Sequence, residues 1–315
     1  MVGPAKLNCS CAMERIDMRW TRDVEPRPAV ARLYNQAMII TLAGNIMLAL
    51  SKGIVAYLSG SVALYADTAN SLSDVVYSLL MVFGLRLSQR PPDISHPQGH
   101  SRFEPLVGLA VTFSMGFAGY EAARASIERL AQGGMAVEPG LPTIVLLFSA
   151  AVKAGMFVMI RRIAKELSSP TLDTTAKDNL SDVLTSSAAF IGALGSKYIS
   201  PLTDPIAGLL VAAWIFRAAF MAGRENLDFL TGAGGSQEQR EAMVKIAEAV
   251  PGVQHVHHLM AEYAGPKLVV DLHINVNGDL SLNEAHAIAD AVIEQVGALP
   301  DVDRVYVHVE PIGFD

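Results

Sequence analysis

The sequence predicts a membrane-embedded bundle of six α-helices followed by a small cytoplasmic α+β domain of ferredoxin-like type. Three observations lead to this prediction. First, 51% of the 315 residues are hydrophobic and only 17% are charged, whereas soluble globular domains carry roughly a quarter charged residues. Second, the apolar residues gather in segments near the length that a helix needs to cross a bilayer. Third, the pattern changes after residue 233 to short amphipathic stretches.

Six apolar segments can be marked along the first two thirds of the chain. They cover residues 35–58, 62–87, 105–127, 141–162, 176–198 and 203–224. Basic residues gather in the N-terminal arm and around the links after the second and fourth segments, as Arg86, Arg90, Arg102, Arg161, Arg162, Lys165 and Lys177. The positive-inside rule therefore places both termini in the cytoplasm, with the chain expected in the cell membrane.

The last part of the chain alternates helical and strand periodicity. Helical patterns cover 236–250 and 283–296, and strand patterns cover 255–264, 267–276 and 303–311. The order α-β-β-α-β predicts a compact two-layer domain. We therefore divide the chain into an N-terminal arm (1–33), a transmembrane domain (34–230) and a cytoplasmic domain (233–315).

Charge and cysteine content limit the possible partners. The formal net charge is −7, and no basic tail is present, so nucleic acid is not an expected partner. Cys9 and Cys11 lie in the polar arm. They are too close together to predict a disulfide framework, and we expect no function from them.

Carboxylates occur inside two of the apolar segments. Asn70 and Asp74 lie in the second segment, and Asp178 and Asp182 lie in the fifth. Residues four apart share one face of a helix, and a carboxylate in the bilayer costs a few kcal/mol unless it is paired. No lysine or arginine is an obvious partner for all three, so a divalent cation between the two helices is expected. The alternative is a set of carboxylates that hydrogen-bond to Ser and Thr neighbours in a packed bundle.

Asp67 lies on the same face as Asn70 and Asp74, one turn earlier. It could be a further ligand. We favour a role in which it holds a ligand residue by a hydrogen bond without touching the ion.

Several motifs together resemble the cation diffusion facilitator family of metal-ion exporters. They are "GSVALYADTANSLSDVV", "HPQGHSRFEPL", "DNLSDVLTSSAA" and the α-β-β-α-β tail. The resemblance implies a homodimer in the lipid bilayer that exports divalent transition-metal ions in exchange for protons. It also implies a four-ligand transport site at Asn70, Asp74, Asp178 and Asp182.

The donor set suggests which metal is carried. Zinc-exporting members usually have histidine at one or more of these positions, and zinc prefers nitrogen and sulfur ligands. Asn70 and the three aspartates offer only oxygen, which suits harder ions such as Mn²⁺, and the set resembles the manganese branch of the family. Fe²⁺ remains open, followed by Zn²⁺, Co²⁺ and Cd²⁺.

Two further groups have the chemistry of metal ligands. Asp93, His96 and His100 lie on a predicted loop, where some family members carry a second site, although solvated loop histidines would look the same. In the tail, family members bind metal at the dimer interface at positions matching His257, His273, His286, His308 and Glu310. Ordinary surface histidines are the alternative. His255 and His258 match no family position.

A charged latch between the two halves is a further expectation. Family members place such a latch between the membrane and cytoplasmic parts, and Arg102 and Asp228 are the candidates here. Other classes of function remain as alternatives. A membrane-anchored metal sensor would need no paired carboxylates in the bundle, and an intramembrane enzyme would need a histidine pair or a nucleophile that the segments lack. We therefore expect a transporter, with no enzyme activity and no resident cofactor.

Overall fold

A computed structural model describes residues 20–22, 28–59, 62–133 and 141–313, so Cys9 and Cys11 lie outside the described residues. Six long helices come first: α1 (Pro28–Ser59), α2 (Val62–Ser88), α3 (Phe103–Ala131), α4 (Leu141–Leu167), α5 (Pro170–Tyr198) and α6 (Thr203–Thr231). Each predicted apolar segment lies within one of them. Most of the helices extend past the apolar segment at one or both ends, because a helix can continue into water beyond the hydrocarbon layer.

Five of these helices, α1, α2, α3, α4 and α6, are long and apolar enough to cross a membrane. The exception, α5, carries Asp173, Lys177, Asp178 and Asp182 within four turns. Helix α5 packs against α3, α4 and α6, so its polar face is turned into the bundle. Large apolar side chains such as Phe113, Phe117 and Leu210 are instead exposed on the outside, where lipid would cover them.

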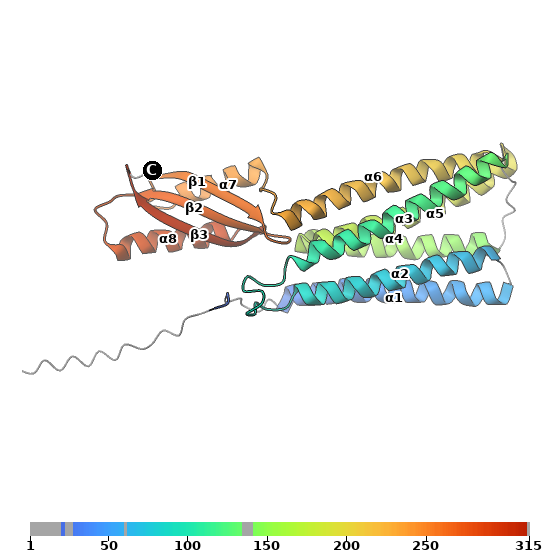
Figure 1. The fold of residues 1–315 in the computed structure, drawn as a ribbon, viewed down its shortest axis with the longest axis horizontal. Coiled ribbons are helices and arrows are strands. Elements are labelled where there is room, and N and C mark those ends of the chain that lie inside the picture. Colours follow the sequence, from blue (N-terminus) through green and yellow to red (C-terminus); the bar gives the residue numbers. More distant parts are fainter. Residues whose placement is uncertain (1–19, 23–27, 60–61, 134–140, 314–315) are drawn as a thin grey trace, which may run out of the picture.

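The helices form two groups in the bundle (Figure 1). Helix α3 lies along α6, while α1 packs against α2 and α4. Helix α4 also packs against α5, which joins the two groups. Helices α2 and α5, which carry the predicted ligands, both pack against α3, and the Thr175 hydroxyl of α5 donates to the Met81 sulfur of α2 at 3.5 Å.

The chain ends in a separate α+β domain at one end of the bundle (Figure 1). It consists of α7 (Gln237–Glu248), β1 (His255–Tyr263), β2 (Leu268–Val276), α8 (Leu282–Gly297) and β3 (Val302–Pro311). The sheet order is β1-β2-β3, antiparallel between β1 and β2 and parallel between β2 and β3. One face of the sheet packs on α7 and α8 around its own core, which includes Leu268, Leu272 and Val292. The predicted fold class is confirmed.

Both helices of this domain begin with a capping box. Ser236 accepts a hydrogen bond from the backbone N–H of Gln239, and Ser281 accepts one from that of Glu284. The Gln239 and Glu284 side chains reach back to the capping residues. The Ser281 contacts hold the pKa of the exposed Glu284 carboxyl below its ordinary value. These caps satisfy N–H groups that a helix start otherwise leaves unpaired.

A buried carboxylate joins three helices near the α+β domain. Glu104, in the first turn of α3, is 2% exposed. It accepts hydrogen bonds from the Tyr34 hydroxyl of α1 at 2.8 Å and from the Ser169 hydroxyl at the start of α5. Ser169 is also the N-cap of α5. The contacts fix the ends of α1, α3 and α5 relative to one another.

The bundle contacts the α+β domain at several points. The Ser101 hydroxyl donates to the Ala264 carbonyl at 3.0 Å, and the Ser168 hydroxyl donates to Asp301 at 3.2 Å. Gly265 has a φ of +81°, and a Cβ at this position would lie 2.7 Å from the Ser101 carbonyl oxygen. The turn between β1 and β2 therefore needs glycine to dock on the segment before α3.

Candidate metal centre

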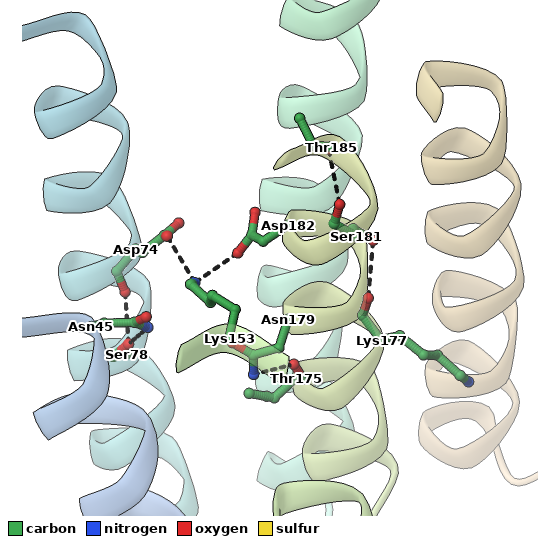
Figure 2. Close-up of polar contacts among 10 residues, drawn as sticks. All are labelled: Asn45, Asp74, Ser78, Lys153, Thr175, Lys177, Asn179, Ser181, Asp182 and Thr185. Atoms are coloured by element: carbon green, nitrogen blue, oxygen red, sulfur yellow. Dashed lines mark hydrogen bonds and ion pairs between the residues drawn. The ribbon is translucent and has the colours of Figure 1, made fainter. Parts of the chain in front are cut away.

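The candidate site lies between α2 and α5, and a lysine from α4 occupies its middle. The Lys153 ammonium lies 3.0 Å from Asp74 Oδ2 and 2.6 Å from Asp182 Oδ2. The Lys153 side chain is only 6% exposed, against 18% for Asp74 and 28% for Asp182. Figure 2 shows the lysine reaching between the two carboxylates. The aspartates do share a site, but their partner here is a cation of the chain itself.

This lysine was not predicted, because only a single lysine or arginine that could pair with all three carboxylates was considered. The signal was present: Lys153 lies in the middle of the apolar segment 141–162. An ionisable residue at such a position faces the bundle interior and pairs with an opposite charge.

Asn70, Asp74 and Asp182 line one cavity of about 90 Å³. Its wall also includes Lys52 of α1, and Ser149, Lys153 and Thr185. Asn70 and Asp74 share a face of α2, as predicted from their spacing. Three of the four predicted ligands are thus brought to one cavity.

Asp178 lies one turn nearer the α+β domain and lines a second, smaller cavity of about 20 Å³, whose wall includes Asp74, Asn45 and Asn179. The Asn45 amide nitrogen donates to the Ser78 hydroxyl at 2.7 Å, and that of Asn179 donates to the Thr175 carbonyl at 2.9 Å. Both amide oxygens are buried, and neither has a hydrogen-bond partner among the residues that the structure describes.

The donors fit a hard divalent cation as substrate. The four predicted ligands present only amide and carboxylate oxygens: Asn70, Asp74, Asp178 and Asp182. The amide oxygens of Asn45 and Asn179, which have no partner among the described residues, are further oxygen donors nearby. Oxygen donors favour Mn²⁺ over softer metals. The three carboxylates do not converge on one point in this structure, since Asp74 lies on both cavities while Asp178 and Asp182 lie on one each.

The predicted loop group comes together. Asp93, His96 and His100 place ligand atoms within 4.8 Å of one another. His100 is 4% exposed, and within the described part of the chain its Nδ1 has no hydrogen-bond partner. The His96 backbone N–H donates to Asp93 at 2.7 Å, and this bond, with the nearby imidazoles, holds the pKa of the Asp93 carboxyl below its ordinary value.

Most of the predicted tail group also comes together, on the face of the sheet opposite α7 and α8. His257 and His308 lie 3.1 Å and 3.0 Å from Glu310, and His273 lies 3.7 Å from it. His286 does not join them, because it is exposed on α8 beside Asp290.

His258 is an additional member of this group. Its ring centroid lies 4.7 Å from that of His273. Strict alternation would place His257 and His258 on opposite faces of β1, but the strand register shifts between Val256 and His258. A β-bulge of this kind redirects side chains, and sequence periodicity does not reveal it.

The remaining predicted residues are not joined to these groups. Asp67 lies in α2, but its side chain is outside the described residues. Arg102 and Asp228 are both exposed, and no ion pair joins them among the residues described. A different ion pair connects to the α+β domain. Arg22, in the N-terminal arm, lies 2.5 Å from the Asp303 carboxylate of β3.

Comparison with known proteins gives the same domain order. Residues 38–231 match the family model of the cation efflux transmembrane domain, and residues 236–312 match that of the cation efflux protein cytoplasmic domain. An uncharacterised transporter of Methanocaldococcus jannaschii is 35% identical over 89% of this chain and 99% of its own. The manganese efflux system protein MneS of Bacillus subtilis is 28% identical over 87% and 94%. The magnetosome protein MamM of Paramagnetospirillum magneticum is 32% identical over 86% of each chain.

Proposed function

Because the chain belongs to the cation diffusion facilitator family of cation efflux transporters, we propose that it exports a divalent transition-metal ion in exchange for protons, with Mn²⁺ as its main substrate. As a multi-pass membrane protein of a transporter family, it would move the ion by alternating access around the site between α2 and α5. Asn70, Asp74, Asp178 and Asp182 would carry the ion.

The all-oxygen donor set supports manganese most directly. Asn70, Asp74 and Asp182 line one cavity, and no imidazole or thiol lines it among the residues described. A zinc site would be expected to include nitrogen or sulfur donors. The name of MneS, a manganese efflux protein similar along nearly the whole chain, agrees with this proposal.

Protons are the proposed counter-ion because the site is anionic. Once the metal has left, Lys153 pairs with Asp74 and Asp182. The three carboxylates Asp74, Asp178 and Asp182 still outnumber this lysine, so like charges repel in a low-dielectric environment. Protons available from the outside can neutralise them while the site turns back to the cytoplasm. The rocking of two helix groups against each other would supply the two states.

We further propose a homodimer in the plasma membrane with both termini in the cytoplasm. The cytoplasmic-domain match covers the whole α+β domain. No helix among the described residues covers the sheet face that carries His257, His273, His308 and Glu310, so a second copy could cover it. This group and the loop group Asp93, His96 and His100 would be additional metal sites.

Transport assays in proteoliposomes test the proposal. Purified protein would be reconstituted with a metal-sensitive and a pH-sensitive dye inside, and Mn²⁺, Fe²⁺, Zn²⁺, Co²⁺ and Cd²⁺ would be added outside in turn. We expect Mn²⁺ uptake with opposite proton movement. Asp74→Ala and Asp182→Ala should abolish uptake, because a site with fewer anionic ligands holds a divalent ion poorly.

Asp173→Ala is the matched control. Asp173 lies on α5 but pairs with Lys177, away from both cavities, so uptake should persist. Full transport by either site variant would contradict the assignment. Preference for Zn²⁺ or Fe²⁺ would correct the metal and keep the transporter. Metal binding without movement of any ion would favour the sensor.

A further inference from the structure

Lys153 places a positive charge at the oxygens proposed to bind the metal. Its ammonium lies 2.6 Å from Asp182 Oδ2 and 3.0 Å from Asp74 Oδ2. We propose that Lys153 is a tethered internal cation, which occupies the transport site when no metal is bound and must withdraw when the metal enters. This inference rests on the proposed function and assigns a role to a residue outside the predicted ligand set.

The ammonium and the metal cannot use the same oxygens at once. A divalent transition-metal ion bound to Asp74 and Asp182 would lie about 2.0–2.2 Å from each carboxylate oxygen. The Lys153 ammonium already lies within hydrogen-bonding distance of both oxygens. Two cations packed against the same pair of oxygens would repel strongly inside the bundle. Occupation by Lys153 and by metal are therefore mutually exclusive.

The cavity offers the ammonium a second position. Ser149 precedes Lys153 by one turn of α4, so both residues share a face of that helix, and both line the 90 Å³ cavity. The Ser149 hydroxyl oxygen is buried with no hydrogen-bond partner among the described residues. It can accept a hydrogen bond from the withdrawn ammonium.

The chemistry of lysine suits this role. Its ammonium is a compact charge on a flexible four-carbon stem, whereas the guanidinium of arginine binds carboxylates through a rigid fork. A lysine can hold Asp74 and Asp182 and still leave them. This predicts that Lys153 weakens metal binding and stabilises the empty transporter, since loss of the lysine would leave two partly buried carboxylates without its positive charge.

Lys153→Met tests both effects in the full-length protein in detergent. Without divalent ions, this variant should melt lower than the wild type by roughly 5–10 °C, a range typical of losing a buried ion pair. Mn²⁺ should bind it about tenfold more tightly, because the competing charge is gone. Mn²⁺ should also raise its melting temperature by more than that of the wild type.

Two variants provide the comparison. Lys153→Arg keeps the charge and should retain the melting temperature of the empty protein while binding Mn²⁺ more weakly. Lys165→Met makes the same change at an exposed lysine near the end of α4 and should behave as wild type. The loop and tail groups can also bind Mn²⁺, so their contribution is subtracted. Only the Mn²⁺ binding that is lost in Asp74→Asn is counted.

The outcomes separate this inference from the proposed function. If the wild type shows no Asp74-dependent Mn²⁺ binding, the proposed function fails. If that binding exists and is unchanged or weaker in Lys153→Met, the inference is overturned. Should Lys153→Met not fold, the double variant with Asp182→Asn should recover folding, because one unpaired carboxylate is gone. A double variant that also fails to fold would show that Lys153 has a packing role unrelated to the ion pairs.

Discussion

Asn70 is the residue on which the choice of metal should depend most. It supplies a neutral oxygen beside Asp74 and Asp182, in the cavity that also holds the lysine. We predict that Asn70→His lowers the Mn²⁺-to-Zn²⁺ transport ratio, because imidazole suits zinc and zinc already binds most sites more tightly than manganese does. Specificity is a difference between two affinities, so the ratio should change even if total transport falls.

Asn70→Asp is the control, since it keeps an oxygen donor at the same position and should retain Mn²⁺ transport. Both ions must be measured in the same vesicles at the same pH gradient. A ratio in Asn70→His equal to that of the wild type would show that selectivity is set elsewhere, and Asp67 would be examined next.

Asn45 is predicted to act on the passage of the ion rather than on its selection. Asn45 lines the small cavity together with Asp178, and its amide oxygen is buried without a hydrogen-bond partner among the described residues. We predict that Asn45→Ala slows Mn²⁺ uptake about tenfold, the effect of losing roughly 1.4 kcal/mol of ion stabilisation along the route. The measurement is the initial rate of uptake into proteoliposomes.

Asn226→Ala is a matched control for Asn45→Ala. Asn226 is also buried. Its amide nitrogen donates to the Thr174 hydroxyl, and its amide oxygen has no partner among the described residues. It lies on α6, outside both cavities. Both variants should lose stability, but only Asn45→Ala should slow uptake. Equal slowing in both would mean that the effect comes from packing.

Individual residues show where prediction from sequence stops. The spacing of Asn70, Asp74, Asp178 and Asp182 fixed which helix face each occupies. It could not show that α4 brings Lys153 to Asp74 and Asp182, because the arrangement of helices in a bundle depends on long-range packing. Asn45 was missed for this reason, since it comes from α1. Lys153 was missed although its position in the middle of an apolar segment was a signal.

At the scale of elements, hydrophobic periodicity placed all six long helices and the α-β-β-α-β order of the tail. Helix α5 was found although it is the most polar of the six, because its second half, from Val183 to Leu194, is largely apolar. The bulge in β1 was not predictable, since it depends on pairing with β2. That bulge brings His258 next to His273 and enlarges the possible metal site.

The sheet group leads to a prediction for the α+β domain alone. This domain has its own hydrophobic core, so residues 233–315 should fold in isolation. We predict that Zn²⁺ or Mn²⁺ raises its melting temperature by mass action, and that His273→Ala with His308→Ala removes the increase. Differential scanning calorimetry with and without metal measures this.

Two exposed histidines outside the sheet group form the control pair. His255 contacts Glu248, and His286 contacts Asp290, so replacing both with alanine should leave the metal effect intact. If neither metal changes the melting temperature of the domain, the sheet histidines are ordinary surface residues and not metal ligands.

At the scale of the whole molecule, the contact between the two halves differs from the expectation. A latch between Arg102 and Asp228 was expected from the resemblance to the family, whose members place a charged latch between the two halves. Both side chains are exposed and are not joined. The sequence could not indicate Arg22 as a partner, because Arg22 and Asp303 are separated by nearly the whole chain.

Arg22 links three parts of the molecule. Its guanidinium donates to both carboxylate oxygens of Asp303, at 2.5 and 3.0 Å, and its backbone N–H donates to the Pro97 carbonyl at 3.0 Å. Both side chains of the pair are about a quarter exposed. A two-point arginine–carboxylate contact is stronger and more directional than a single ion pair. Arg22 therefore ties the segment before α3 to the edge of the sheet.

We predict that Arg22→Ala loosens the α+β domain from the bundle without unfolding either one. Amides at the start of β3 and in the segment 89–102 should exchange hydrogen about five- to tenfold faster, which corresponds to losing roughly 1 kcal/mol of docking. Arg124→Ala removes an exposed arginine that pairs within α3 and should leave these rates unchanged. Exchanging the two charges, with Arg22→Asp and Asp303→Arg together, should restore part of the protection. Rates in Arg22→Ala equal to the wild type would mean that the Ser101 and Ser168 contacts hold the halves together without it.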